Sequence, residues 1–151
     1  EDGEYLASFR SPFNSRNNLG YLHNHRHPLI AKYFNFGKLC VAVNMLHTDF
    51  QDRNNGSDQD SDSIFTTNHP DVVNHAKYCY QNHPTIVNKI PMEKNHYNNT
   101  MDDFAKIDNK LAAAQMAIGE SSNLAQLSLS YTYNFDDVKY DDYVCILSVV
   151  A

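Results

Sequence analysis

The chain has 151 residues, of which 42% are apolar and 20% charged, and this suffices for one domain with a hydrophobic core. Its formal net charge of −6 excludes the class of proteins that bind nucleic acid over their whole surface, because phosphate contacts need clustered Lys and Arg. The net charge does not exclude a local binding site for phosphates in which a metal ion supplies the positive charge. No apolar run approaches the roughly 18 residues of a membrane span, so no membrane partner is expected.

The first half of the chain is predicted to hold one helix and a small β unit. Residues 1–27 are rich in Pro, Asn, Gly and Ser and are predicted to form turns and loops. From Pro28 the apolar spacing is helical, and Gly37 is placed to end that helix. Residues 38–46 form a continuous apolar run of strand length, which periodicity leaves open between strand and helix. A polar loop over 48–63 leads into a predicted strand, "SIFTT".

Two helices are predicted after that strand. Asp71 is expected to cap a helix that stops before Pro84. Residues 85–91 are predicted to be extended. Thr100 is then expected to cap a helix with apolar residues at three- and four-residue steps, and Gly119 is expected to end it.

The last part of the chain gives one conflicting pattern. Within residues 121–135, the part from Leu127 to Phe135 alternates like a strand, but Ser121 or Ser122 can cap a helix there, and the helix is preferred. A final helix is predicted from about Val138. The sequence therefore predicts an α+β fold: a small, incomplete β unit around residues 38–67 within a region spanning 1–99, followed by a helical region over 100–151.

Three aspartates at alternate positions, Asp58, Asp60 and Asp62, are the least ordinary feature of the sequence. In an extended chain such residues point to one side, roughly 6.5–7 Å apart, and a tight loop brings them closer. Mg²⁺ takes oxygen ligands in an octahedron and keeps some water, so three carboxylates can hold one face of the ion. The alternative is a solvated acidic loop. An EF-hand is excluded, because it needs Gly at position six and Glu at position twelve of the loop, where this chain has Ser63 and His69.

Two motifs in this order resemble the catalytic region of the largest subunit in cellular-type, double-psi-barrel RNA polymerases. That family has Asp-x-Asp-Gly-Asp, then a short strand, a Pro and a helix, as in "DQDSDSIFTTNHPDVVNHAK". Upstream, "FRSPFNSR" is similar to the family's Asn-Arg-x-Pro-Thr-Leu-His-Arg element, with Arg10, Pro12 and Arg16 matching without a gap. The resemblance covers roughly residues 8–82. Ser61 stands where the family has Gly, and Phe9 where it has Asn.

The resemblance implies a partial double-psi barrel and two-metal nucleotidyl transfer. Asp58, Asp60 and Asp62 would hold the catalytic Mg²⁺, and Arg10 would lie near the sugar of the incoming nucleotide, with Arg16 as a second substrate-binding candidate. The partners would be a nucleic acid template, nucleoside triphosphates and the remaining regions of the same polypeptide. We expect the chain to be a fragment of a longer protein and to be inactive alone. The alternative function is a non-enzymatic interaction domain of phage or mobile-element origin.

Two further groups of residues were weighed as sites. "HNHRH" places His23, His25 and His27 at alternate positions, but no fourth zinc ligand is evident, and a surface loop is the preferred interpretation. The three cysteines are far apart with no CxxC pair. They are predicted to be reduced thiols of a cytoplasmic protein.

Overall fold

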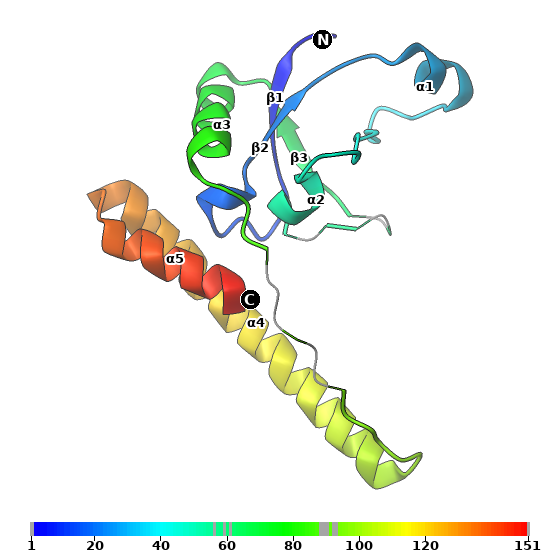
Figure 1. Cartoon of the computed structure of the whole chain (residues 1–151), viewed down its shortest axis with the longest axis vertical. Helices are drawn as coiled ribbons and strands as arrows, with labels where there is room; N and C mark the ends of the chain where they lie inside the picture. Colours follow the sequence, from blue (N-terminus) through cyan, green and yellow to red (C-terminus); the bar gives the residue numbers. More distant parts are fainter. Residues whose placement is uncertain are drawn as a thin grey trace. The chain divides into compact units, whose positions relative to one another are not determined.

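The computed structural model describes residues 2–55, 57–58, 60, 62–87, 91 and 94–150. The fold is α+β, as predicted: a small antiparallel sheet belongs to the first part of the chain, and the second part is helical. The chain divides into two compact units, Glu1–Thr85 and Ile86–Ala151 (Figure 1). Each unit is described separately below.

The sheet of the first unit has three strands in the order β2-β1-β3, with both pairings antiparallel. They are β1 (Tyr5–Phe9), β2 (Gly20–His23) and β3 (Phe65–Thr67). In the register, Ser8 faces Gly20 on one side and Thr66 on the other. A Cβ atom at Gly20 would overlap the buried Ser8 hydroxyl, so a larger residue there would force the Ser8 side chain to move.

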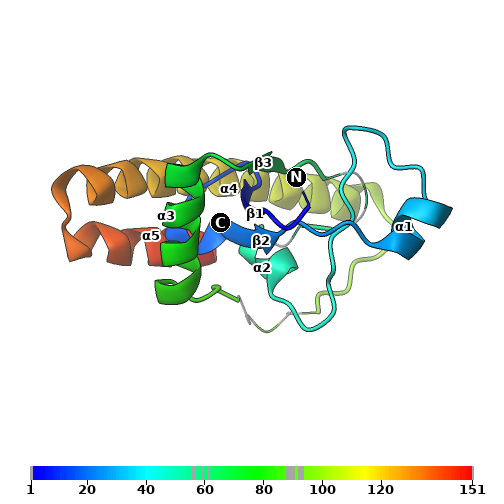
Figure 2. The same ribbon diagram turned by 90° about the horizontal axis from the view of Figure 1, so that it is seen from above.

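Helix α3 (Pro70–Asn82) packs against β1 and β2 and closes the core of this unit (Figure 2). The core is built from small and medium side chains, namely Ala7, Leu19, Ala76 and Cys79, with Phe9, Phe13, Tyr21, Val72 and Val73 packed around them. The helix begins two residues earlier than predicted. His69 is the N-cap and Pro70 takes the first helical position, where its missing N–H costs nothing. Asp71 therefore lies in the first turn and is not the cap.

Short elements complete the first unit: the 3-10 helix η1 (Arg16–Asn18), α1 (Pro28–Tyr33) and α2 (Phe50–Arg53). The predicted helix from Pro28 exists but ends at Tyr33, four residues before Gly37.

The position of the β unit differs from the prediction. Strand β3 lies within "SIFTT", as expected, but β1 and β2 come from residues 1–27, which were predicted to be turns. The apolar run 38–46 is described in full and forms neither strand nor helix; Leu39 is 98% exposed. The three-stranded sheet forms without this run, which pairs with none of its strands.

The second unit is a helical hairpin, in which α5 (Val138–Val150) runs back along the C-terminal half of α4 (Met101–Phe135) (Figure 1). Thr100 caps α4 as predicted: its side chain accepts a hydrogen bond from the Asp103 N–H at 3.3 Å. The turn between the helices uses Asp136 in the left-handed region, at φ 50°.

Helix α4 does not end at Gly119, as the sequence predicted, but continues to Phe135. The preferred helix over residues 121–135 is thereby confirmed, and the alternating pattern there is not a strand. Ala125, Leu129 and Thr132 recur at helical spacing and are buried, as is Val144 of α5. Among the described residues, no helix combines the length and apolar character needed to cross a membrane.

Candidate metal centre

A buried arginine fixes the start of the aspartate loop. The Arg53 side chain, at the end of α2, is only 4% exposed. Its guanidinium donates to the Asp49 carboxylate at 3.0 and 3.3 Å and to the carbonyls of Asn17 and His83 at 3.2 Å each. It also lies 4.7 Å from the centre of the Tyr80 ring. A buried charge persists only when it is paired and hydrogen-bonded, and these contacts meet that condition.

The pKa of Asp49 reflects the same network. Burial acts to raise it, but a hydrogen bond from the Thr85 hydroxyl and the charge of Arg53 together hold the pKa of this carboxyl below its usual value. Asp49 is therefore ionised at neutral pH and keeps its partner role.

A second set of hydrogen bonds ties the loop to the segment that carries the upstream motif. The Asn55 side chain donates to the Pro12 carbonyl at 2.5 Å, and the Asn18 side chain donates to the Arg53 carbonyl at 3.2 Å. The Ser57 N–H donates to the carbonyls of Gln51 and Asn54, each at 3.2 Å. The loop therefore leaves a stem that is anchored on the Pro12–Asn18 segment.

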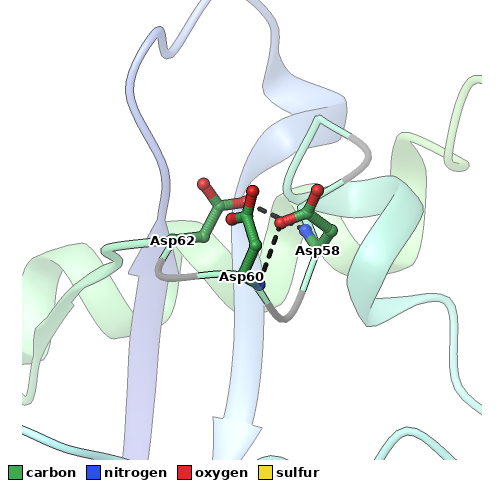
Figure 3. A group of neighbouring side chains, drawn as sticks. All are labelled: Asp58, Asp60 and Asp62. Carbon is green, nitrogen blue, oxygen red and sulfur yellow. Dashed lines mark hydrogen bonds between the residues drawn. The ribbon is translucent and has the colours of Figure 1, made fainter.

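The three aspartates converge (Figure 3). One ligand oxygen from each of Asp58, Asp60 and Asp62 can be chosen so that all lie within 4.8 Å of one another. Two backbone groups help to hold them: the Asp58 N–H donates to Asp62 Oδ2 at 2.9 Å, and the Asp60 N–H donates to Asp58 Oδ1 at 3.2 Å. Gln59 and Ser61, including the departure from the family's Gly, lie outside the described residues.

The electrostatics of the loop show the effect of crowding three carboxylates. The hydrogen bond and the negative charge of Asp58 raise the pKa of Asp60, and Asp62 adds to the effect. The pKa of Asp58 is lowered by hydrogen bonds from Asp60 and by the charge of Arg10. Asp60 is thus harder to ionise than Asp58 while no cation is bound. A divalent cation would replace repulsion with attraction at this point.

Arg10 brings the two sequence motifs into contact. Its guanidinium lies just after β1 and contacts Asp62 Oδ1 at 2.7 Å, across 52 positions of sequence. Both side chains are partly buried. Asp62 therefore uses one oxygen for Arg10 and the other for the Asp58 N–H, which orients it at one edge of the loop.

Arg16, the second predicted substrate-binding residue, begins η1 and is half-buried. Its charge acts on His75 of α3, where it adds to burial in lowering the pKa of that imidazole. The structure thus places Arg10 at the aspartates and Arg16 within reach of α3.

The sequence did not reveal the anchoring role of Arg53. A signal was present, since Asp49 and Arg53 stand four residues apart, the spacing at which opposite charges meet on a helix. The same spacing is common on solvated helix surfaces, and only the contacts with Asn17 and His83 show that this pair is buried.

The histidine triplet lies at the end of β2 and beyond it. The ring centres of His23 and Tyr5 are 4.9 Å apart, and those of His25 and His27 are 6.4 Å apart. The Nδ1 atom of His25 lies 3.6 Å from a carboxylate oxygen of Asp2. Within the part of the chain that the structure describes, the aspartates are the one group of three or more His, Cys, Asp or Glu residues with ligand atoms close enough to share an ion.

Comparison of the chain with protein-family models, curated proteins and solved structures found no match. Carboxylate oxygens are the ligands that Mg²⁺ and Mn²⁺ prefer, whereas zinc prefers nitrogen and sulfur in a tetrahedral set. The residues at this loop fit Mg²⁺.

Proposed function

We propose that the aspartate loop is a Mg²⁺ site and that the chain forms the metal-binding part of an RNA-polymerase-like nucleotidyltransferase. The observation that supports this most is the meeting of two motifs. Asp58, Asp60 and Asp62 converge within 4.8 Å, and Arg10 from the upstream motif reaches Asp62. The family resembled by the sequence uses both motifs for one reaction, so their proximity is what a shared site requires.

The residues of this chain would bind the metal ion and orient the nucleotide. The three carboxylates would act as metal ligands and not as nucleophiles, because the reaction needs no covalent step on the protein. When bound, Mg²⁺ lowers the pKa of the attacking 3′-hydroxyl and offsets the charge that develops on pyrophosphate. Arg10, at the edge of the loop, would contact the sugar of the nucleotide. The Arg53 network would hold the stem so that the carboxylates stay together.

In the complete protein the partners would be a template strand, nucleoside triphosphates and the other regions of the polypeptide. A second set of basic residues would have to come from those regions, since within the described loop the aspartates have Arg10 as their cationic contact. We therefore expect metal binding, but not polymerisation, from these 151 residues alone.

One observation favours the alternative, a non-enzymatic domain with an acidic loop. Asp58 and Asp60 are exposed, so water screens their repulsion even without a cation. The two functions differ in one respect: the alternative predicts no selective affinity of the loop for divalent ions.

The first prediction concerns Asp60. Replacing it with Asn removes one of three ligand charges at nearly constant size, so Mn²⁺ affinity should fall by about tenfold or more. The fold should be unchanged, and stability should not drop, because the carboxylate that Asp58 repels is gone. The measurement is calorimetric titration with Mn²⁺, which binds such sites more tightly than Mg²⁺, followed by competition with Mg²⁺.

The matched control is Asp71→Asn, which removes an exposed carboxylate in the first turn of α3. This variant should bind Mn²⁺ like the wild type. Equal affinity in the wild type and Asp60→Asn would leave the acidic-loop interpretation standing. In the complete protein, Asp60→Asn should abolish synthesis and keep template binding, and an active variant would refute the catalytic role.

A further inference from the structure

Charge is distributed unevenly along this acidic chain. Residues 5–48 contain five Arg or Lys and no Asp or Glu, whereas residues 49–151 contain fifteen Asp or Glu and seven Arg or Lys. A protein of net charge −6 thus has one long stretch that carries only positive formal charge. Positive charge that is concentrated in one exposed part of a chain attracts anionic partners.

The end of this stretch is an exposed segment of the first unit, residues 24–48, here called the basic segment. It leaves β2, forms α1 and returns to α2 without joining the sheet (Figures 1 and 2). Arg26, Lys32 and Lys38 are exposed on it. Large apolar side chains are exposed as well, namely Leu29, Ile30, Tyr33, Phe34, Phe36, Leu39, Val41 and Leu46.

Aromatic side chains and lysines lie close together within this segment. Tyr33, Phe34 and Phe36 lie between Lys32 and Lys38. The Phe34 and Phe36 rings are 5.7 Å apart between centroids and nearly parallel, at 7°. The Lys32 ammonium lies 5.1 Å from the centre of the Tyr33 ring. The outcome is an exposed set of aromatic faces flanked by cations.

We propose that residues 32–38 of the basic segment form a binding surface for single-stranded nucleic acid. Unpaired bases stack on exposed aromatic rings whatever their sequence, and the neighbouring lysines contact the phosphates. Both requirements are met here by adjacent side chains. The first turn of the segment contributes less to binding, because the Asp2 carboxylate lies there. It accepts a hydrogen bond from the backbone N–H of Arg26 and lies near His25.

Other anionic partners fit the segment less well. A duplex hides its base faces in the stack, so the rings would have nothing to stack on. An anionic membrane is typically recognised by four to eight clustered cations or by an extended amphipathic helix, whereas this segment has three cations and α1 has six residues. An acidic peptide would match the charge but not the parallel rings.

The proposal goes beyond the metal site and does not depend on it. Binding is therefore measured with a chelator present, so that the aspartate loop plays no part. The probe is a labelled oligo(dT) of about 20 nucleotides, titrated with the 151-residue chain by fluorescence anisotropy. The titration is repeated between about 50 and about 200 mM salt.

Changing the rings and changing the charges should have different effects. Phe34→Ala with Phe36→Ala should weaken binding by about tenfold or more and leave its salt dependence unchanged. Lys32→Gln with Lys38→Gln should weaken binding and reduce the slope of log affinity against log salt by about 1.4, since each phosphate contact contributes about 0.7. All four side chains are exposed, so the fold should persist, which circular dichroism checks.

The controls remove the same chemistry from the acidic part of the chain. Phe135→Ala removes an exposed ring that stacks on Tyr131 at 5.6 Å, and Lys139→Gln removes a cation that lies over Tyr143. Neither should alter oligonucleotide affinity. No binding by the wild type, or equal losses in the control variants, would overturn the proposal. So would competition by polyglutamate at equal charge, or ring-dependent binding to phosphatidylserine vesicles without binding to oligo(dT).

Discussion

Arg10 and Arg53 act on the aspartate loop from opposite ends. The buried guanidinium of Arg53 donates hydrogen bonds to Asp49 and to two backbone carbonyls, and these bonds hold the stem of the loop in place. Arg10 is partly buried and is paired with Asp62. The first contact is structural, whereas the second places a cation beside the three carboxylates.

His75 gives a prediction about pH. Burial and, to a smaller degree, the charge of Arg16 lower the pKa of its imidazole in the folded protein. In the unfolded chain the same group takes up a proton near its ordinary pKa of about 6.5. Between that value and the lower folded value the unfolded state binds more protons, so the free energy of unfolding must fall as the pH falls through this window.

Urea titrations at several pH values between about 7 and 5 test this effect. The free energy of unfolding of the wild type should fall more steeply toward low pH than that of His75→Gln, which has no imidazole to protonate. His96→Gln, at an exposed position, is the control and should follow the wild type. Parallel curves for the wild type and His75→Gln would show that the folded imidazole is not resisting protonation.

At the scale of elements, α4 shows that a helix can continue past a residue that often terminates helices. Gly119 is exposed within the helix, and its backbone does not need positive φ. Glycine weakens a helix through its conformational entropy, by roughly 1 kcal/mol relative to Ala. The contacts between α5 and the following turns, through Ala125 and Leu129, are sufficient to carry the helix past it.

Gly119→Ala should therefore stabilise the helical hairpin by up to about 1 kcal/mol. No atom lies within 4 Å of the position that the new methyl group would occupy, so no clash offsets the gain. The reverse change at a neighbouring exposed position, Ala117→Gly, should cost a similar amount. Thermal unfolding followed by far-UV circular dichroism gives both values. A loss of stability in Gly119→Ala would mean that the glycine conformation is required.

At the scale of the whole molecule, the fold places three thiols in three environments. Cys40 is exposed in the basic segment, and Cys79, on the inward face of α3, is buried in the core. Cys145 is exposed on α5, but partial burial and the charges of Asp141 and Asp142 raise the pKa of its thiol. The thiolate is the reactive form, so access and pKa together set the rate of alkylation.

The native protein should be alkylated first at Cys40, then at Cys145, and at Cys79 only when the first unit opens. Peptide mass spectrometry during reaction with iodoacetamide near pH 8 measures the three rates separately. The same reaction in urea is the control, and there the three rates should approach one another. Rapid labelling of Cys79 in the native protein would contradict its place in the core.

The local pattern of the sequence determined most of the helical content. Apolar spacing and a capping residue are properties of neighbouring positions, and this is why the helix capped by Thr100, the helical character of 121–135 and the last helix were predicted correctly. The strand within "SIFTT" and the loop carrying Asp58, Asp60 and Asp62 are equally local features, because strand propensity and a two-residue spacing are read within a few positions.

Only the tertiary structure decided which segments found partners. Strands β1 and β2 are short and contain Ser8 and Gly20 in place of a clear alternation, and they exist because they pair with each other. The more apolar run 38–46 pairs with none of the three strands and forms no strand itself. The burial of Arg53 and the contact between Arg10 and Asp62 join positions up to 52 residues apart. A contact of that span depends on how the whole chain is routed, which no local spacing encodes.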